Sequence, residues 1–231
     1  MRRMPVRGIV RPLNQAAMAS DLSVRVAQLR VREAQSFRKG DVLLTFDCER
    51  LEAEQAAAEA VHREMKIALD SNVYLDKRGA VGRNDVEVSR ARVDKAGADA
   101  RALKARLRQC VVAAPFDGRV VELTISEHEI PAPGKPFITL VDEAAFEIDV
   151  IMPSLALKRL APGQAFTFSV DETGQDYPAK VLRIGAAVDP VSQTVKVIAA
   201  FDNRDERVLP GMSGTASFPD QVGMPGAGAG R

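Results

Sequence analysis

The sequence predicts a mainly β protein that carries one long α-helical hairpin and a β-barrel, and three observations support this fold class. Residues 49–109 are charged and rich in alanine, and their apolar positions recur with helical spacing. Short apolar runs bounded by Gly, Pro and Asp flank this segment and indicate β-strands. From residue 146 onwards, short strand-like runs follow at regular intervals, which is typical of a small barrel.

The strands on the two sides of the helical segment are expected to belong to one domain. Alternating or apolar runs, separated by turn signals such as Lys39-Gly40-Asp41, occur at 22–27, 29–32, 42–46, 120–125 and 137–141. Because the helical segment interrupts these runs, we expect residues 8–48 and 110–142 to form two halves of a small β-domain.

Residues 49–109 are predicted to form two antiparallel helices of a coiled coil. On the first arm a 3-4 spacing links Leu51, Glu54, Ala58, Val61, Met65, Ala68, Asn72 and Leu75. On the second arm it links Val86, Ser89, Val93, Ala96, Ala100, Leu103 and Leu107. At ~1.5 Å per residue, helices of this length make a rod of roughly 40 Å.

Glycines and charges indicate where the chain turns and how the helices pair. Gly79 and Gly82 interrupt the pattern, and Asn84 with Glu87 predicts a capping box that starts the second helix. The first helix begins with mostly acidic residues and the second ends with mostly basic ones. An antiparallel hairpin sets these blocks side by side, and each block also suits its own helix dipole.

The C-terminal part is predicted to be a β-barrel domain spanning 143–218. Strands are expected at 146–150, 165–170, 177–184, 194–201 and 214–218, with one short helix over 153–160. The tail 219–231, which ends in a Gly-Ala repeat, is expected to be disordered.

Cys48 and Cys110 flank the helical segment symmetrically about Gly79. A hairpin that folds at Gly79 brings them to the same end of the rod, where a disulfide requires Cα atoms about 4.4–6.8 Å apart. However, extending the helical register places Cys48 nearer residue 113. A disulfide and two separate buried thiols therefore both remain open.

Composition excludes several classes of function. Lys and Arg (32) balance Asp and Glu (31), so no basic excess suggests nucleic acid. Aromatic residues are scarce and Trp is absent, which disfavours stacking platforms for single strands. No apolar run approaches the ~18–20 residues needed to cross a bilayer.

Three groups of motifs carry a resemblance to a known family. Residues 38–47 read Arg-Lys-Gly-Asp-Val-Leu-Leu-Thr-Phe-Asp, and 113–120 read Ala-Ala-Pro-Phe-Asp-Gly-Arg-Val. Barrel motifs follow at 160–164, 188–195 and 209–212. In this order over residues 8–218, they resemble the motifs of periplasmic adaptor proteins, also called membrane fusion proteins, of Gram-negative tripartite export systems.

This resemblance implies a split lipoyl-like β-sandwich, a coiled-coil hairpin and a β-barrel. It implies a non-enzymatic periplasmic homo-oligomer without a cofactor, which links an inner-membrane transporter to an outer-membrane channel. The transporter could be of the resistance–nodulation–division or ABC type, and an adaptor of polysaccharide export is an alternative. Anchoring to the inner membrane is expected through a segment not included in this sequence.

The resemblance also implies a contact with the channel at the hairpin tip. Many members carry an Arg, a Leu and a Ser there, whereas this chain has Ser71, Leu75 and Gly82 at the corresponding positions. Only the Leu matches. We therefore take Leu75, Arg78 and Arg83 as the candidate channel contacts.

Two other classes of function are less well supported by the sequence. A swinging-arm carrier needs an exposed Lys in the turn between its halves, but the nearest downstream lysine is Lys66, within the helix. A metal-handling adaptor needs three or four convergent ligands. His62 is interpreted as a solvated helix residue, Met65 as a core residue and His128 as a turn residue. No nucleophile elbow or phosphate loop indicates catalysis.

Overall fold

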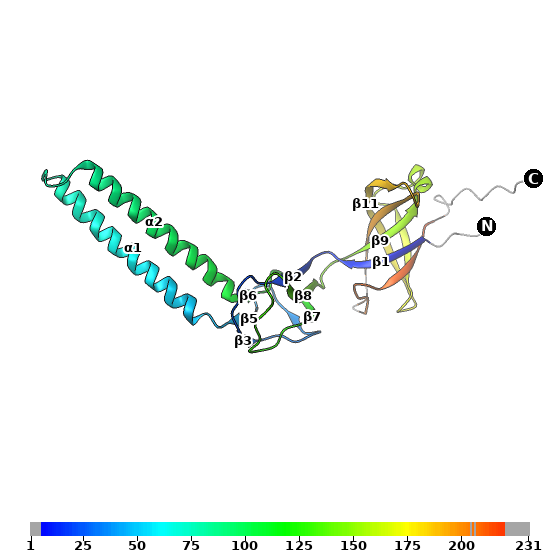
Figure 1. The fold of residues 1–231 in the computed structure, drawn as a ribbon. Coiled ribbons are helices and arrows are strands. Elements are labelled where there is room, and N and C mark those ends of the chain that lie inside the picture. The colour runs from blue at the N-terminus through cyan, green and yellow to red at the C-terminus, as the bar shows by residue number, and fades with distance from the viewer. Residues whose placement is uncertain (1–5, 204, 206, 220–231) are drawn as a thin grey trace, which may run out of the picture. The chain divides into compact units, whose positions relative to one another are not determined.

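The computed structural model describes residues 6–203, 205 and 207–219 (Figure 1). The chain divides into two compact units, which we call the barrel unit (1–15 and 141–231) and the hairpin unit (16–140). Apart from Pro219, the predicted disordered tail lies outside the described residues. Within the described part of the chain, no helix combines the length and apolar character that crossing a bilayer requires.

The barrel unit is a closed antiparallel barrel of six strands in the order β1-β13-β10-β11-β12-β9 (Figure 1). The strands are β1 (Val6–Pro12), β9 (Phe146–Pro153), β10 (Ala165–Val170), β11 (Gln175–Asp189), β12 (Thr194–Phe201) and β13 (Ser213–Ser217). A short 3-10 helix, η2 (Ser154–Lys158), follows β9. Alternate residues of each strand fill the core, with Phe168 and Ile148 fully buried. The predicted barrel is confirmed.

β1 corrects the predicted division of the chain. The sequence places residues from 8 onwards in the split β-domain, but residues 8–12 belong to β1, which pairs with β9 and β13 and closes the barrel. That part of the prediction is wrong because an alternating pattern predicts a strand without naming its partner. Gly8 pairs with Gly214, and the ring of Phe168 packs over both glycines.

The β part of the hairpin unit contains strands from both sides of the helical segment. One sheet has the order β2 (Gln15–Ala19), β8 (Pro136–Asp142), β7 (Gly118–Leu123) and β4 (Ser36–Phe37). A second sheet has the order β3 (Val26–Leu29), β5 (Val42–Phe46) and β6 (Val111–Ala113). A single hydrophobic core draws residues from both halves, including Leu43, Leu44, Val120 and Leu140.

The two long helices, α1 (Glu49–Asp76) and α2 (Arg83–Leu107), pack against each other as a hairpin (Figure 1). A 3-10 turn, η1 (Arg108–Cys110), ends the second arm. Of the predicted seam on α2, Val86, Ser89, Ala96 and Ala100 are buried. The mainly β fold with one helical hairpin is confirmed.

The predicted seam on α1 is wrong at two positions. Val61 is 46% exposed and Ala68 is exposed, whereas their neighbours His62 and Leu69 are half-buried. Leu69 brings a larger apolar side chain to the interface than Ala68 does. His62 fits because Gly97 on α2 leaves room for its ring, so its interpretation as a solvated residue is also wrong.

The turn between the helices forms around Gly79. Gly79 has φ +71°, its N–H donates to Asp76, and the N–H of Ala80 donates to the Leu75 carbonyl. This is the pattern of a Schellman motif, in which glycine supplies the left-handed conformation that ends a helix. The predicted capping box at Asn84 is wrong. α2 begins after Gly82, whose N–H donates to the Asp85 carboxylate at 3.1 Å.

Candidate functional site

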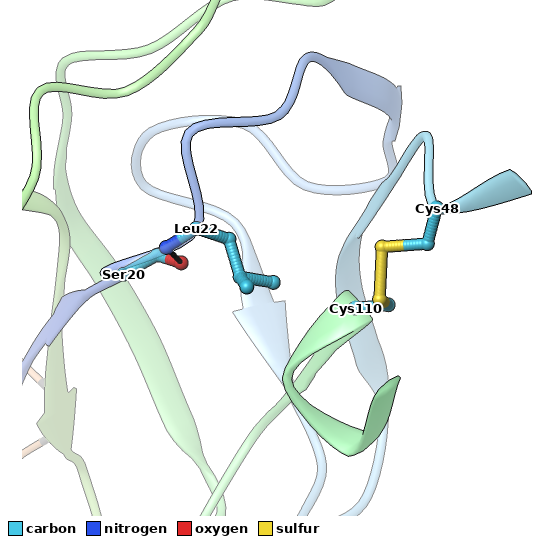
Figure 2. The surroundings of a disulfide bond; sticks show 4 residues. All are labelled: Ser20, Leu22, Cys48 and Cys110. Carbon is cyan, nitrogen blue, oxygen red and sulfur yellow. Dashed lines mark hydrogen bonds between the residues drawn. A yellow bond between two sulfur atoms is a disulfide. The ribbon is translucent and has the colours of Figure 1, made fainter. Parts of the chain in front are cut away.

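The base of the hairpin is where the two halves of the β-domain meet. β5 pairs with β6, so that Thr45 lies opposite Val111. A disulfide joins Cys48, three residues after Thr45, to Cys110, one residue before Val111 (Figure 2). Both cysteines are buried in the same core as Leu22. The helices therefore leave the β-domain from two strand ends that are hydrogen-bonded and covalently joined.

The structure explains why the helical register did not decide the cysteine pairing. Cys48 is the residue before α1 and Cys110 ends η1, so neither lies within an α-helix. The adjacent β5–β6 ladder sets their spacing instead, and their Cα atoms are 6.2 Å apart. This separation lies within the range that a disulfide requires.

An ion pair supports the strand end beside Cys48. Asp47 accepts a hydrogen bond from Arg25 at 2.7 Å, and its backbone N–H donates to the Arg25 carbonyl. The hydrogen bond from the Arg25 side chain is the main reason that the pKa of Asp47 is lowered. Asp47 is therefore ionised at neutral pH and links β5 to the segment before β3.

Inside the hairpin, one polar pair interrupts the apolar contact. The Asn72 amide donates to the Ser89 hydroxyl at 2.6 Å, and Ser89 is only 6% exposed. A buried hydroxyl without a partner is costly, so this bond favours the register in which the two residues face each other. Ala96, Gly97 and Ala100 on α2 are small, which leaves space for longer side chains of α1.

A shallow notch lies halfway along the hairpin, where His62 packs over Gly97. Its walls are Glu59, His62, Arg63, Arg101 and Lys104. The Glu59 carboxylate accepts a hydrogen bond from the Gln55 side-chain amide. Across the described residues, no group of three or more His, Cys, Asp and Glu side chains is arranged to hold a metal ion.

The tip carries the three residues predicted to contact a channel. Leu75 is half-buried at the end of α1, and its carbonyl accepts the bonds that close the turn. Arg78 is exposed, and its guanidinium lies 4.5 Å from the centre of the Tyr74 ring. Arg83 is exposed at the first residue of α2. Tyr74, 54% exposed, was not predicted from the sequence, although its place one turn before Arg78 was a usable signal.

The barrel matches a known protein family. Residues 148–222 match the family model of the CusB-like β-barrel domain. An uncharacterized protein of Haemophilus influenzae is 29% identical over 208 residues, which is 89% of this chain and 54% of that protein. YdhJ of Escherichia coli, also uncharacterized, is 25% identical over 185 residues, 73% of this chain and 65% of YdhJ. The chain thus spans about half to two thirds of these relatives.

Solved structures show the same fold. A MacA–MexA chimeric protein containing the Pseudomonas aeruginosa MexA α-hairpin domain superposes with a TM-score of 0.79 at 19% identity, covering 94% of this chain and 82% of the chimera. The membrane fusion protein Spr0693 of Streptococcus pneumoniae gives a TM-score of 0.76 at 13% identity, covering 93% and 97%.

The barrel, the hairpin and these matches bear on the family resemblance that the sequence motifs carry. The resemblance to the periplasmic adaptor, or membrane fusion protein, family is confirmed. Over residues 148–222, the barrel is similar to the CusB-like β-barrel domain.

Proposed function

We propose that this chain is part of a periplasmic adaptor subunit that links an inner-membrane transporter to an outer-membrane channel. In this proposal the two-halved β-domain is a split lipoyl-like sandwich and the hairpin is an antiparallel coiled coil. The observation that carries the proposal is the closure of the β-domain beneath the hairpin by the β5–β6 ladder and the Cys48–Cys110 disulfide.

This closure gives the hairpin a defined direction relative to its own β-domain. α1 and α2 have 28 and 25 residues, so the hairpin reaches roughly 40 Å at ~1.5 Å per residue. An arm of this length on a loose base would swing widely at its tip. An arm fixed by paired strands and a disulfide holds its tip at a set position, which is what a bridging subunit requires.

The tip residues Leu75, Arg78 and Arg83 are the proposed channel contacts. Arg78 stacked on the exposed Tyr74 ring offers a partner both a cation and an apolar face. Arg and Tyr are enriched among the residues that contribute most to protein interfaces. We add Tyr74 to the proposed contacts on this ground.

The remaining features of the proposal follow from the adaptor family. We propose that the protein works in the periplasm as a homo-oligomer, attached to the inner membrane, with a transporter of either the resistance–nodulation–division or the ABC type. The polysaccharide-export and metal-binding alternatives are not favoured by any specific observation. His62 is the only histidine of the hairpin, and its neighbours in the notch are mostly cations.

Charge reversal at the tip tests the proposal. The Arg78→Glu/Arg83→Glu variant should bind a purified outer-membrane channel of the tripartite type at least about tenfold more weakly in surface plasmon resonance, because both changes fall at the contact. The matched control Arg92→Glu/Lys95→Glu reverses two exposed charges along the side of α2 and should leave binding intact. Unchanged binding of the tip variant, with an unchanged melting temperature, would reject these contacts.

A further inference from the structure

One end of the barrel exposes large aliphatic side chains. They come from η2, from the end of β11 and from the turn between β11 and β12. We call them the η2-end patch: Leu155 (63% exposed), Leu157 (37%), Val188 (42%) and Val191 (93%). Single exposed aliphatic residues are ordinary, but a cluster on adjacent loops marks an interaction site.

The two segments of the patch lie side by side. The N–H of Ser154, the first residue of η2, donates to the Gln193 carbonyl at 2.8 Å. The strands that lead into them are paired as well, with Pro153 opposite Thr194. The two segments that carry the patch are therefore neighbours at the same end of the barrel.

Both segments are held firmly by their own contacts. The Asp189 carboxylate accepts hydrogen bonds from the N–H groups of Val191 and Ser192, at 3.0 and 2.8 Å, and from the Ser192 hydroxyl at 2.9 Å. The bond from the Ser192 N–H is the largest cause of the lowered pKa of Asp189. On the other segment, Ala156 and Leu160 are buried in the barrel core. The exposed side chains thus project from an ordered frame, which reduces the entropy lost on binding.

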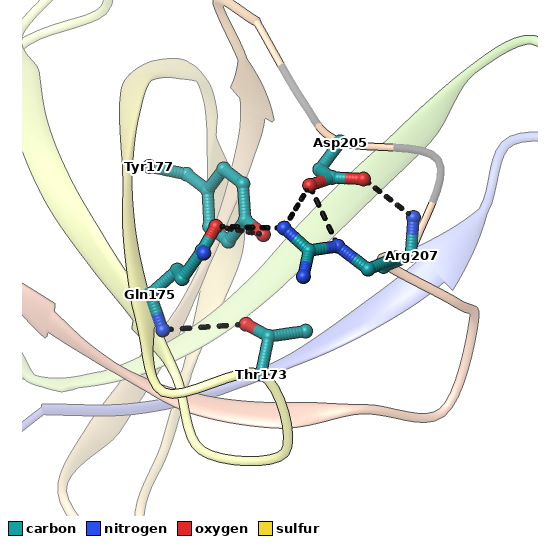
Figure 3. Close-up of polar contacts among 5 residues, drawn as sticks. All are labelled: Thr173, Gln175, Tyr177, Asp205 and Arg207. Carbon is teal, nitrogen blue, oxygen red and sulfur yellow. Dashed lines mark hydrogen bonds and ion pairs between the residues drawn. The ribbon is translucent and has the colours of Figure 1, made fainter.

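Charge is distributed unevenly along the barrel. Among the described residues, the loops at the η2 end carry Lys158 and Arg159 against one acid, Asp189, whose carboxylate is hydrogen-bonded within its own turn. The described loops at the opposite end carry mostly acids. Asp171, Asp202 and Asp205 are ion-paired with Arg7, Lys180 and Arg207, and Glu172 accepts hydrogen bonds from Ser213. Figure 3 shows this opposite end, where Arg207 is bound by Asp205 and also donates to Gln175. The apolar side chains therefore lie at the end of the barrel where the described loops carry more cations than acids.

We propose that the η2-end patch docks onto the surface of a bilayer that contains anionic phospholipid. Aliphatic side chains that project beside Lys and Arg suit the boundary between headgroups and acyl chains, where burial and attraction to anionic lipid add. Val191 is almost fully exposed, and hydrogen bonds to Asp189 hold its turn in place. Its side chain therefore projects as a small apolar anchor and does not line a pocket that could receive a partner's side chain. This proposal goes beyond the adaptor role and does not depend on a channel.

Vesicle co-sedimentation of the full chain tests this proposal. The protein should bind phosphatidylglycerol-containing vesicles at least about tenfold more strongly than phosphatidylcholine vesicles, and binding should weaken in high salt. Leu155→Asp/Val191→Asp should reduce this binding by at least about tenfold, and Lys158→Glu by about fivefold or more. The matched control Ile67→Asp changes an aliphatic residue of the hairpin that is 70% exposed and should bind as the unchanged protein does.

Each outcome decides the proposal. It is overturned if the unchanged protein does not sediment with anionic vesicles, or if it binds neutral vesicles equally well. It is also overturned if the Ile67→Asp control loses as much binding as the patch variant. If the patch variant keeps its vesicle binding but loses binding to a transporter, the patch is a protein interface and not a membrane surface. Circular dichroism of each variant verifies that the barrel remains folded.

Discussion

Loss of the Cys48–Cys110 disulfide is expected to destabilise the hairpin unit by about 4 kcal/mol. The bond joins residues 62 apart in the sequence. For a closed loop on the order of 60 residues, the loss of chain entropy in the unfolded state corresponds to about 4 kcal/mol. An exposed ion pair within one helix, such as Arg50 with Glu54, contributes only about 0.3–0.5 kcal/mol. The disulfide should therefore be the largest single contribution at the hairpin base.

Urea unfolding followed by circular dichroism at 222 nm measures this effect, because the hairpin supplies most of the helical signal. With a urea dependence of about 2 kcal/mol per molar, a loss of 4 kcal/mol lowers the midpoint by about 2 M. The oxidised and reduced proteins are compared. The Cys48→Ala/Cys110→Ala variant serves as the control, since its midpoint should not respond to reductant.

A midpoint shift below about 0.5 M on reduction would refute this reasoning. It would mean that the β5–β6 ladder and the buried core hold the base together without the covalent link, or that the hairpin remains associated in urea. Hydrogen exchange of the helix ends then separates these two explanations. If reduction loosens the base, amide exchange at the first turn of α1 should be faster in the reduced protein than in the oxidised protein under native conditions. If the base is held without the disulfide, the two exchange rates should be equal.

Three further perturbations have defined outcomes. Asn72→Ala leaves the buried Ser89 hydroxyl without its partner and should lower hairpin stability by about 1–3 kcal/mol in urea unfolding, whereas the additional change Ser89→Ala should restore part of it. Gly214→Ala would place a Cβ 2.6 Å from the Phe168 ring and should cost the barrel about 1–3 kcal/mol, measured by calorimetry; an unchanged melting temperature would contradict this packing. The pKa of Asp189 is lowered in the folded state. The ionised carboxylate therefore stabilises the fold fully above the ordinary Asp pKa of about 3.9, and this stabilisation is lost as pH falls through the lowered pKa. Asp189→Asn should flatten the dependence of the melting temperature on pH between about 5 and 2.

Features with a strong local pattern could be predicted from the sequence. α1 begins at Glu49, as predicted, because apolar spacing and acidic residues mark the start of a helix independently of its surroundings. The strand β10 over Ala165–Val170 also matches its predicted range, since alternation over six residues defines both its extent and its inward face. The turn at Gly79 follows from the one residue type that adopts a positive φ without strain.

Features that depend on distant partners could not be predicted. The role of β1 in the barrel depends on residues near 150 and 214, and no local pattern identifies them. The heptad phase on α1 is ambiguous, because Val61 and His62 both fall near the same face. Only the presence of Gly97 on the other arm decides between them.

In the candidate site, too, local features could be predicted and contacts with distant residues could not. Symmetry about Gly79 indicated that Cys48 and Cys110 lie near each other, but the bond itself depends on the β5–β6 ladder. The prediction of Leu75, Arg78 and Arg83 rests on their position at the tip, and their role in channel contact stays a prediction. The stacking of Arg78 on Tyr74 is a side-chain choice that sequence alone leaves open.

The nested order of the strands has a consequence for biogenesis. Val6 in β1 pairs with Ala216 in β13, so the barrel cannot close until the chain has been synthesised as far as β13. Residues 16–140 form a complete unit within that interval, and the hairpin is in turn inserted between β5 and β6. The innermost part can therefore fold first and the outermost last. Evolution can also lengthen the innermost part by whole heptads, added in matched numbers to both arms, without altering any pairing in the outer layers.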